Sequence, residues 1–302
     1  MSEHITQVKN RIPSNEYPFE SHFVQIGQHK MHYLDEGKGP VVVMVHGNPS
    51  WSFYYRKLVA RLSKTHRCIV PDHIGCGLSD KPTDDTYSFT LEERISDLDQ
   101  LLTQVCPDEP VIMVVHDWGG MIGTSWATRH SDRIRGLVVL NTAAFHMPSD
   151  KALPWQLFLA RNTSLGSLLV RGFNAFSVGA SVIGCTRKPM PSNIKKAYQA
   201  PYDSWNNRIA TLRFVQDIPL KPGDSGYDIV SQTSDSLSLF QQTPTFIGWG
   251  LKDVVFDETF LRVWKTKFPH ATTVEVPDGG HYILEDAPEI MLPAVEKFIS
   301  EL

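Results

Sequence analysis

A carboxylate occupies a point in the sequence where a short apolar run ends abruptly and small residues follow. The run covers residues 111–115, Asp117 comes one residue later, and Gly119, Gly120 and Gly123 precede an amphipathic stretch. The apolar, β-branched run predicts a buried strand, and the stretch after it predicts a helix. A strand, a tight turn and a helix together expose one side chain at a sharp bend. We therefore predict that Asp117 is presented at such a bend.

A carboxylate at this bend narrows the possible chemistry. When a carboxylate attacks an alkyl carbon it leaves an ester that water can open, whereas a serine would leave a stable ether. The side chain needs no activating base, because a carboxyl group with a pKa of about 3.9 is ionised at neutral pH. The alternative is that Asp117 only caps the following helix. One departure from the usual G-x-S-x-G pattern of such bends is Val115, which stands where that pattern has its first glycine.

His281 and Asp253 are the candidate partners of Asp117. His281 follows the predicted strand Thr272–Val276 and two glycines, and Asp253 lies just past the predicted strand Pro244–Trp249. In this role Asp253 holds the histidine in one tautomer and stabilises its cation, and the histidine activates water. Each residue alone has a simpler explanation, since histidine and aspartate are common in loops and turns.

A second turn, with the sequence H-G-N-P, follows the predicted strand Pro40–Val45. Its backbone N–H groups are placed where an oxyanion would sit, and we expect the amides of Asn48 and Trp118 to form that pair. Their side chains add two N–H donors, aimed into the cavity, that can hold a departing anion. The alternative is that Asn48 forms the turn and Trp118 packs in the core.

The elements that must position these residues alternate between strands and helices. A hairpin is predicted over residues 22–34, strands at 40–45, 68–71, 111–117, 134–141, 244–249 and 272–276, and helices at 52–62, 90–105, 258–267 and 288–302. Thr90 and Glu93 are predicted to form a capping box. This alternation indicates an α/β fold with a mostly parallel central sheet covered on both faces. The candidate residues, with Asn141, fall at the carboxyl ends of strands, where such sheets bind ligands.

The alternation stops between about Ala143 and Tyr227. Helical pieces rich in Trp, Leu and Phe are predicted there instead, at Pro154–Arg161, Leu165–Phe176, Ser192–Tyr198 and Trp205–Ile218. We predict an inserted helical cap at residues 143–227, over a core made of residues 1–142 and 228–302. An apolar cap of this kind excludes water and receives an apolar substrate.

Composition excludes several classes of function. The 302 residues carry a net charge of −4 without a basic cluster, so we expect no nucleic-acid partner. The four cysteines have no C-x-x-C spacing, which favours reduced thiols in a cytoplasmic protein. We expect no cofactor and no metal, and we read Gly75-x-Gly77 as a turn. No signal peptide and no transmembrane segment are expected, although a membrane-surface role of the cap stays open.

Together these motifs resemble a known family. The H-G-N-P turn at residues 46–49, the H-D-W-G-G motif at 116–120, Asp253 and Gly280-His281 resemble the haloalkane-dehalogenase-like α/β-hydrolases, from about residue 23 to the end of the chain. The resemblance implies an α/β-hydrolase fold with the nucleophile–acid–histidine order of its catalytic triad. Asn48 and Trp118 match the halide-holding donors of that family. An acid at position 253, with Asn141 rather than Glu at the previous strand end, resembles the third dehalogenase subfamily.

That subfamily includes the β-lactone decarboxylases of bacterial long-chain olefin biosynthesis. Residues 48–56 and 70–82 look most like this branch. The resemblance implies a cis-β-lactone with two long alkyl chains as substrate, an olefin and carbon dioxide as products, and partner enzymes that include a β-lactone synthetase. Attack of Asp117 on the ring carbonyl and attack on the β-carbon are both open at this point.

Three alternatives accompany this interpretation. A haloalkane dehalogenase would use the same residues to release halide through an ester of Asp117. An epoxide hydrolase would need cap tyrosines to protonate the epoxide oxygen, and Tyr198, Tyr202 and Tyr227 are available. A non-enzymatic binding role is disfavoured, because a nucleophile, a base, an acid and anion donors are all present.

Overall fold

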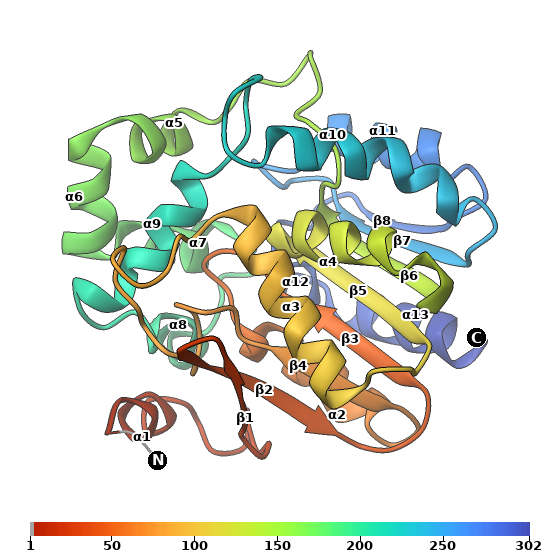
Figure 1. Cartoon of the computed structure of the whole chain (residues 1–302), viewed down its shortest axis with the longest axis horizontal. Coiled ribbons are helices and arrows are strands. Elements are labelled where there is room, and N and C mark those ends of the chain that lie inside the picture. Colours follow the sequence, from red (N-terminus) through yellow and green to blue (C-terminus); the bar gives the residue numbers. More distant parts are fainter. Residues whose placement is uncertain (1–2) are drawn as a thin grey trace.

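The computed structural model describes residues 3–302 as a sheet between two layers of helices, with further helices at one end (Figure 1). The sheet has the strand order β1-β2-β4-β3-β5-β6-β7-β8. Its strands are β1 His22–Ile26, β2 His29–Glu36, β3 Val41–Val45, β4 Arg67–Pro71, β5 Val111–Asp117, β6 Ile134–Thr142, β7 Thr245–Gly250 and β8 Thr272–Val276. The strands β1 and β2 form an antiparallel hairpin, and β2 pairs with β4 antiparallel. The six remaining neighbours in the sheet, β4-β3-β5-β6-β7-β8, all run parallel. The predicted mostly parallel sheet is therefore confirmed.

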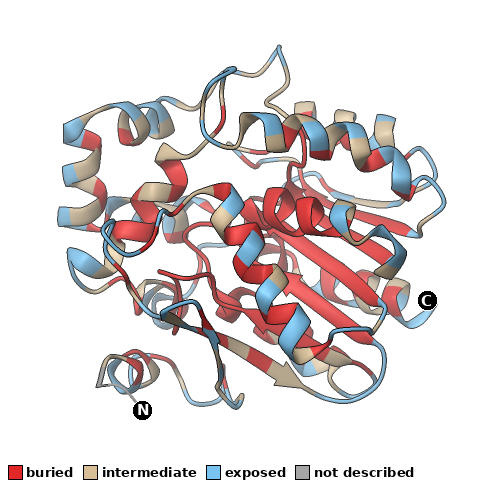
Figure 2. Ribbon diagram, viewed as in Figure 1, coloured by how far each residue is buried: buried red, intermediate tan, exposed pale blue. Residues whose placement is uncertain are grey.

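The centre of the sheet is buried on both faces because β3 is apolar throughout and β5 is apolar up to its carboxyl end. Alternate side chains of a strand point to opposite faces. Val43 and Met113 thus enter one core with α3 (Leu91–Val105), α4 (Trp118–Arg129) and α11 (Glu258–Lys267). Val42 and Ile112 enter the other core with α2 (Arg56–Leu62) and α13 (Pro288–Ser300). Figure 2 shows the central strands and the inner faces of these helices as the buried centre of the molecule.

Between β6 and β7 the chain forms helices and no strand among the described residues. They are α5 Trp155–Asn162, α6 Ser164–Phe173, α7 Ala175–Ile183, α8 Ser192–Gln199, α9 Ile209–Gln216 and α10 Tyr227–Ser236, with short 3₁₀ turns η3 Asn206–Arg208 and η4 Leu237–Phe240. A small separate core joins α5, α6 and α9 through Ala160, Val170, Leu212 and Val215. We retain as a proposal the division into a cap at 143–227 and a core on either side of it.

Several local predictions differ from the structure. Residues 165–176 were predicted as one helix, but Asn174 adopts a left-handed conformation and separates α6 from α7. The capping box is half formed: the Thr90 side chain accepts from the Glu93 amide, whereas the Glu93 carboxylate accepts from Ser88 Oγ at 2.6 Å. Short helices α1 (Glu3–Lys9) and α12 (Ile283–Asp286), and the 3₁₀ turn η1 (Ser52–Tyr55) that opens the helix predicted at 52–62, were also missed.

Two global expectations can be compared with the structure. All four cysteines are buried and free, in agreement with the expectation of reduced thiols. Within residues 3–302, no single helix is long and apolar enough to cross a membrane.

Candidate active site

Asp117 lies at the bend between β5 and α4, as predicted. Its backbone has φ 52° and ψ −128°, a conformation that a non-glycine residue rarely adopts. The bend requires small neighbours: a Cβ atom at Gly119 would fall on the Val45 carbonyl, and one at Gly120 would fall on the Thr142 hydroxyl. That hydroxyl donates a hydrogen bond to the Asp117 carbonyl oxygen. Close packing on both sides therefore maintains a strained backbone that holds the carboxylate at the strand end.

The two oxygens of the Asp117 carboxylate have different surroundings. Oδ1 accepts a hydrogen bond of 2.6 Å from the backbone amide of Asn48, and the amide of Trp118 also bonds to the carboxylate. This approach depends on Gly47, because a Cβ atom there would overlap Oδ1. Oδ2 faces His281 instead. The predicted pair of backbone donors thus meets the nucleophile candidate and leaves one of its oxygens for chemistry.

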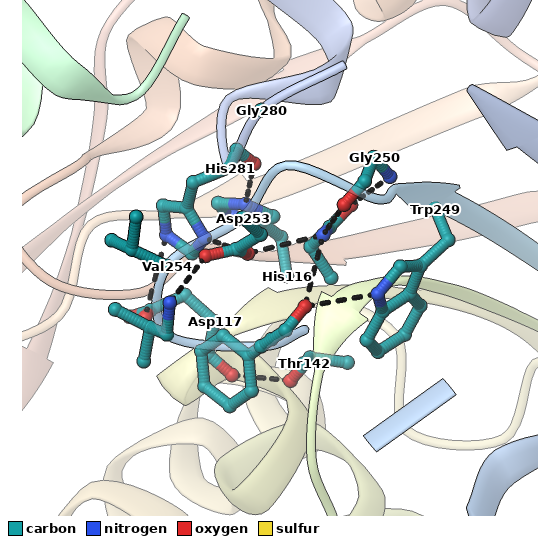
Figure 3. A network of polar contacts seen from close by, with 12 residues as sticks. His116, Asp117, Thr142, Trp249, Gly250, Asp253, Val254, Gly280 and His281 are labelled. Atoms are coloured by element: carbon teal, nitrogen blue, oxygen red, sulfur yellow. Dashed lines mark hydrogen bonds and ion pairs between the residues drawn. The ribbon is translucent and has the colours of Figure 1, made fainter. Parts of the chain in front are cut away.

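His281 lies between two carboxylates (Figure 3). Its Nδ1 is 2.7 Å from Asp253 Oδ2, and its Nε2 is 3.5 Å from Asp117 Oδ2. The other oxygen of Asp253, Oδ1, accepts a hydrogen bond of 2.8 Å from the Val255 amide. Since an ionised carboxylate can only accept, Nδ1 carries a hydrogen and the tautomer of neutral His281 presents a lone pair at Nε2 towards Asp117.

Asn141 adds a positioning contact that the sequence located without assigning a role. Its side-chain amide nitrogen donates to Asp253 Oδ2 and to the Gly250 carbonyl, both at 3.0 Å, and its oxygen accepts from the Gly250 amide at 2.9 Å. Asn141 therefore ties the end of β6 to the end of β7 and fixes the carboxylate that orients His281. Only its place at a strand end, beside an acid on the next strand, indicated this function.

His116 is a second positioning residue, and sequence reasoning missed it. Its Nε2 donates to the His281 carbonyl at 2.9 Å, and its ring lies 4.2 Å from that of Tyr54 and 4.6 Å from that of His281. Burial, and then the nearby charge of His281, lowers the pKa of His116 well below 6.5, so the ring is neutral. A polar side chain that directly follows an apolar run in a buried strand needs a partner, which was the available signal.

Burial and charge shift the pKa values of both reacting groups. Burial raises the pKa of Asp117 above 3.8, against the opposing effects of His281 and of the Trp118 and Asn48 amides. Burial lowers the pKa of His281, but the charge and hydrogen bond of Asp253 and the charge of Asp117 outweigh it, so that the pKa is raised above 6.5. The site therefore favours a protonated histidine beside a carboxylate that is costly to keep charged.

The side chains of Asn48 and Trp118 both face α9. The Asn48 Nδ2 donates to the Thr211 carbonyl at 3.0 Å, and the Trp118 ring packs on Phe214 with centroids 5.3 Å apart. An amide nitrogen carries two hydrogens, so Asn48 keeps one for an anion. Among the described residues, no group of His, Cys, Asp and Glu side chains is arranged to hold a metal ion.

Comparisons with known proteins identify the family of this chain. Residues 40–288 match the family model of the alpha/beta hydrolase fold. The chain is 57% identical to a cis-3-alkyl-4-alkyloxetan-2-one decarboxylase of Shewanella oneidensis, over 94% of this chain and 89% of that protein. It is 48% identical to the Xanthomonas campestris pv. campestris protein of the same name, over 89% and 92%. The crystal structure of haloalkane dehalogenase DbeA from Bradyrhizobium elkani has a TM-score of 0.83 at 24% identity, covering 94% of this chain and 98% of that one.

The solved dehalogenase shares the fold, and the two relatives are similar in sequence to this chain over most of their length. The resemblance on which the fold and family were predicted is confirmed. The chain therefore belongs to the alpha/beta hydrolase fold family, as a relative of the cis-3-alkyl-4-alkyloxetan-2-one decarboxylases.

Proposed function

We propose that this chain decarboxylates a cis-β-lactone with two alkyl substituents, giving an olefin and carbon dioxide, with Asp117 as the nucleophile. The geometry of Asp117 carries the proposal, because Oδ1 is held by the Asn48 amide while Oδ2 faces His281. This geometry occurs in a chain that is 57% identical to a cis-3-alkyl-4-alkyloxetan-2-one decarboxylase. The nucleophile is thus fixed in orientation while one oxygen is able to form a bond.

The proposed course begins with attack of Asp117 Oδ2 on the β-carbon of the ring. The bond from this carbon to the ring oxygen breaks, which opens the strained ring and leaves a carboxylate beside an ester of Asp117. The bond between that carboxylate and the α-carbon then breaks, and the carboxylate leaves as carbon dioxide. The electron pair of the broken bond forms the double bond and expels the Asp117 carboxylate. No water is consumed, and the enzyme returns to its starting state.

Attack at the ring carbonyl serves this outcome less well. It would join the carboxyl carbon to Asp117 as an anhydride and leave an alkoxide on the β-carbon, which is a poor leaving group. In the favoured course, the Asn48 and Trp118 side chains hold the carboxylate released by ring opening. His281, whose pKa is raised, carries its positive charge over a wider pH range and stabilises the Asp117 carboxylate as it departs. Asp253 maintains the orientation of His281.

A haloalkane dehalogenase is the second candidate, favoured by the dehalogenase structure that shares the fold. It would require water, activated by His281, to open an ester of Asp117. An epoxide hydrolase is less well supported, because two of the cap tyrosines are already engaged. The Tyr198 hydroxyl donates to Glu285 at 2.9 Å, and that of Tyr202 to the Ser50 carbonyl at 3.3 Å.

The substrate has to be made by an enzyme that closes a β-lactone ring, so we propose a β-lactone synthetase and other enzymes of an olefin pathway as functional partners. The cap, with its apolar side chains, is the proposed binding region for the alkyl chains of the substrate.

A competition of substrates tests the function. The purified chain is given a cis-3,4-dialkyl-β-lactone, 1-bromobutane or 1,2-dibromoethane, and olefin, carbon dioxide and halide are measured. We expect olefin and carbon dioxide from the lactone much faster than halide from either bromide. In water labelled with ¹⁸O, the Asp117 carboxylate should remain unlabelled after lactone turnover. Faster halide release, with ¹⁸O entering Asp117, would establish the dehalogenase instead.

A further inference from the structure

The outer surface of helices α5, α6 and α7 is unusually apolar. Of the 13 large hydrophobic side chains that the structure exposes, nine lie between residues 155 and 205. They are Trp155, Phe158, Leu165, Leu168, Phe173, Val178, Val182, Ile183 and Trp205. Trp155 and Phe173 are 70% and 71% exposed, so the core does not account for them. We call these nine side chains the apolar face.

The spacing of these residues places them on continuous helix surfaces. Leu165 and Leu168 are one turn apart on α6, and Val178 and Val182 are one turn apart on α7. The structure brings α5 and α6, and α6 and α7, into contact. Figure 1 shows α5 and α6 at the edge of the molecule away from the sheet, and Figure 2 shows their outward surfaces as exposed or half-buried. The apolar face is therefore one region rather than scattered side chains.

Charge has a single sign in the segment that carries eight of these nine side chains, and the next carboxylate along the chain is Asp203, two residues before Trp205. Residues 151–202 contain seven of the 29 basic residues of the chain, and all 33 acidic residues lie elsewhere. The seven are Lys151, Arg161, Arg171, Arg187, Lys188, Lys195 and Lys196. This is the reverse of the whole chain, whose net charge is −4. A segment that excludes every carboxylate is matched to a negatively charged surface, because each carboxylate there would be repelled.

Several of these cations are free to meet an external anion. Lys151, Arg161 and Arg187 form ion pairs with carboxylates outside the segment. Within the described part of the chain, the remaining four form none. Arg171 lies over the Trp205 ring, 4.4 Å from its centroid, at the border of the apolar face. Lys195 and Lys196 lie on α8, which packs against α7.

The lengths and apolar composition of α6 and α7 indicate what kind of surface the apolar face can contact. The helices Ser164–Phe173 and Ala175–Ile183 together have the length and apolar composition of a membrane span, but the pair bends by 76° at Asn174. A pair bent this sharply does not cross a bilayer as one helix. Amphipathic helices that do not span a bilayer can instead lie along its surface, with apolar side chains in the acyl region and basic side chains at the headgroups.

From the apolar face, the single sign of charge and the bent helix pair, we propose that α5, α6 and α7 dock on the surface of an anionic lipid membrane. This inference does not depend on the proposed reaction. It suits a substrate with two alkyl chains, since such a molecule concentrates in lipid. α5 and α6 pack on α9 through Ala160, Val170 and Leu212, and α9 contacts the site through Thr211 and Phe214. The docked helices are therefore separated from the site by one helix.

Vesicle flotation of the full chain tests the proposal. We expect the protein to float with vesicles of phosphatidylethanolamine and phosphatidylglycerol, and to bind phosphatidylcholine vesicles at least tenfold more weakly. Raising the salt from about 0.1 M to about 1 M, which shortens the screening length from about 10 Å to about 3 Å, should weaken binding to the anionic vesicles. The readout is binding, so a failure of the proposed reaction would leave this result unchanged.

Two pairs of variants locate the surface. Leu168→Glu with Phe173→Glu should abolish flotation, whereas Leu239→Glu with Ile290→Glu, which also alters exposed apolar residues, should leave it unchanged. Circular dichroism and melting temperature verify that each variant is folded.

A double variant, Lys195→Gln with Lys196→Gln, tests the role of charge and should weaken binding to the anionic vesicles about tenfold or more. Lys38→Gln with Lys64→Gln, which alters two exposed lysines outside the segment, is the matched control. Flotation that is absent in the wild type, or equal in the wild type and the Leu168→Glu/Phe173→Glu variant, would overturn the proposal. A wild-type mass that rises with concentration, without flotation and only while the apolar face is intact, would assign that face to a second copy of the chain.

Discussion

The Nε2 atom of His281 lies 3.5 Å from Oδ2 of Asp117, so the two side chains face each other at a distance that is long for a hydrogen bond and short for a charge interaction. Each is also fixed at its other end: Asp117 by the Asn48 amide at 2.6 Å, and His281 by Asp253 at 2.7 Å. The carboxylate thus has one oxygen held and one available for bond formation. The histidine likewise has one nitrogen held and one available for a proton.

Replacing Asp117 by Asn should remove activity and increase stability. The amide keeps the shape of the side chain but is a poor nucleophile, so we expect kcat to fall by at least about 10⁴-fold. The pKa of Asp117 is raised by burial, so its charging is costlier in the folded protein than in the unfolded chain. A raised carboxyl pKa contributes stability below pH 3.8 that is lost as the pH rises through the folded value. The variant should therefore unfold at a higher temperature than the wild type at pH 7.

The pH dependence of stability provides a control for the comparison of Asp117→Asn with the wild type. The stability advantage of Asp117→Asn should shrink as the pH is lowered towards 3.8, because the wild-type carboxyl group then becomes neutral too. A wild type that is more stable than the variant at pH 7, or a variant that retains full turnover, would contradict this account of the site.

His281 should make stability depend on pH in the opposite way to an ordinary buried histidine. Its pKa is raised above 6.5, so the folded protein binds this proton more tightly than the unfolded chain. The stabilising contribution is complete below pH 6.5 and is lost as the pH rises through the folded value. The free energy of unfolding, measured with urea between about pH 6 and pH 9, should therefore fall more steeply for the wild type than for His281→Gln.

Asp253→Asn provides the control for this effect. The carboxylate of Asp253 is the main group that opposes the burial of His281, so its removal should eliminate most of the difference in slope. An unchanged slope in the Asp253→Asn background would mean that another group titrates.

The core and its catalytic strand ends were predictable from sequence because the deciding signals are local. Periodicity located β5, β7 and β8 to within two residues, and the glycines after Asp117 marked the bend. What sequence could not supply were contacts between distant segments. His116 and the carbonyl of His281 are 165 positions apart, and Asn141 and Asp253 are 112 apart. No pattern within one segment records such pairs.

The region between β6 and β7 was harder to predict for a different reason. Its helices are apolar on faces that do not enter the main core, so periodicity gave helices but not their limits. The break at Asn174 depends on one residue in a left-handed conformation, which Asn tolerates without any strong sequence signal. The helix α7 was missed for this reason.

Asn141 should be needed to position the acid of the triad. Asn141→Ala removes the donor to Asp253 and leaves the Gly250 amide without its acceptor, at a cost of about 1–3 kcal/mol for the unpaired groups. The residue has φ 33°, so alanine adds backbone strain of its own. Asn174, at φ 53° and remote from the triad, gives the matched control through Asn174→Ala. We expect kcat to fall at least tenfold in Asn141→Ala and to remain at the wild-type value in Asn174→Ala, although both variants lose stability. Equal kcat values would show that Asn141 is only structural.

The buried ion pair between Arg56 and Glu285 should be the most sensitive charged contact of the fold. Both side chains are almost completely buried, and Glu285 also accepts a hydrogen bond from Lys57 at 2.7 Å. Glu285→Ala leaves the buried guanidinium of Arg56 with the carboxylate of Glu16, 2.9 Å from Nε, as its remaining ion-pair partner, so the free energy of unfolding should fall by about 1–3 kcal/mol. Glu296, paired with Arg61 at the surface, is the matched control, and Glu296→Ala should cost no more than about 1 kcal/mol. Urea unfolding measures both. The two substitutions differ chiefly in how exposed to water the remaining arginine is. Equal losses of unfolding free energy would therefore show that burial does not decide the strength of these ion pairs.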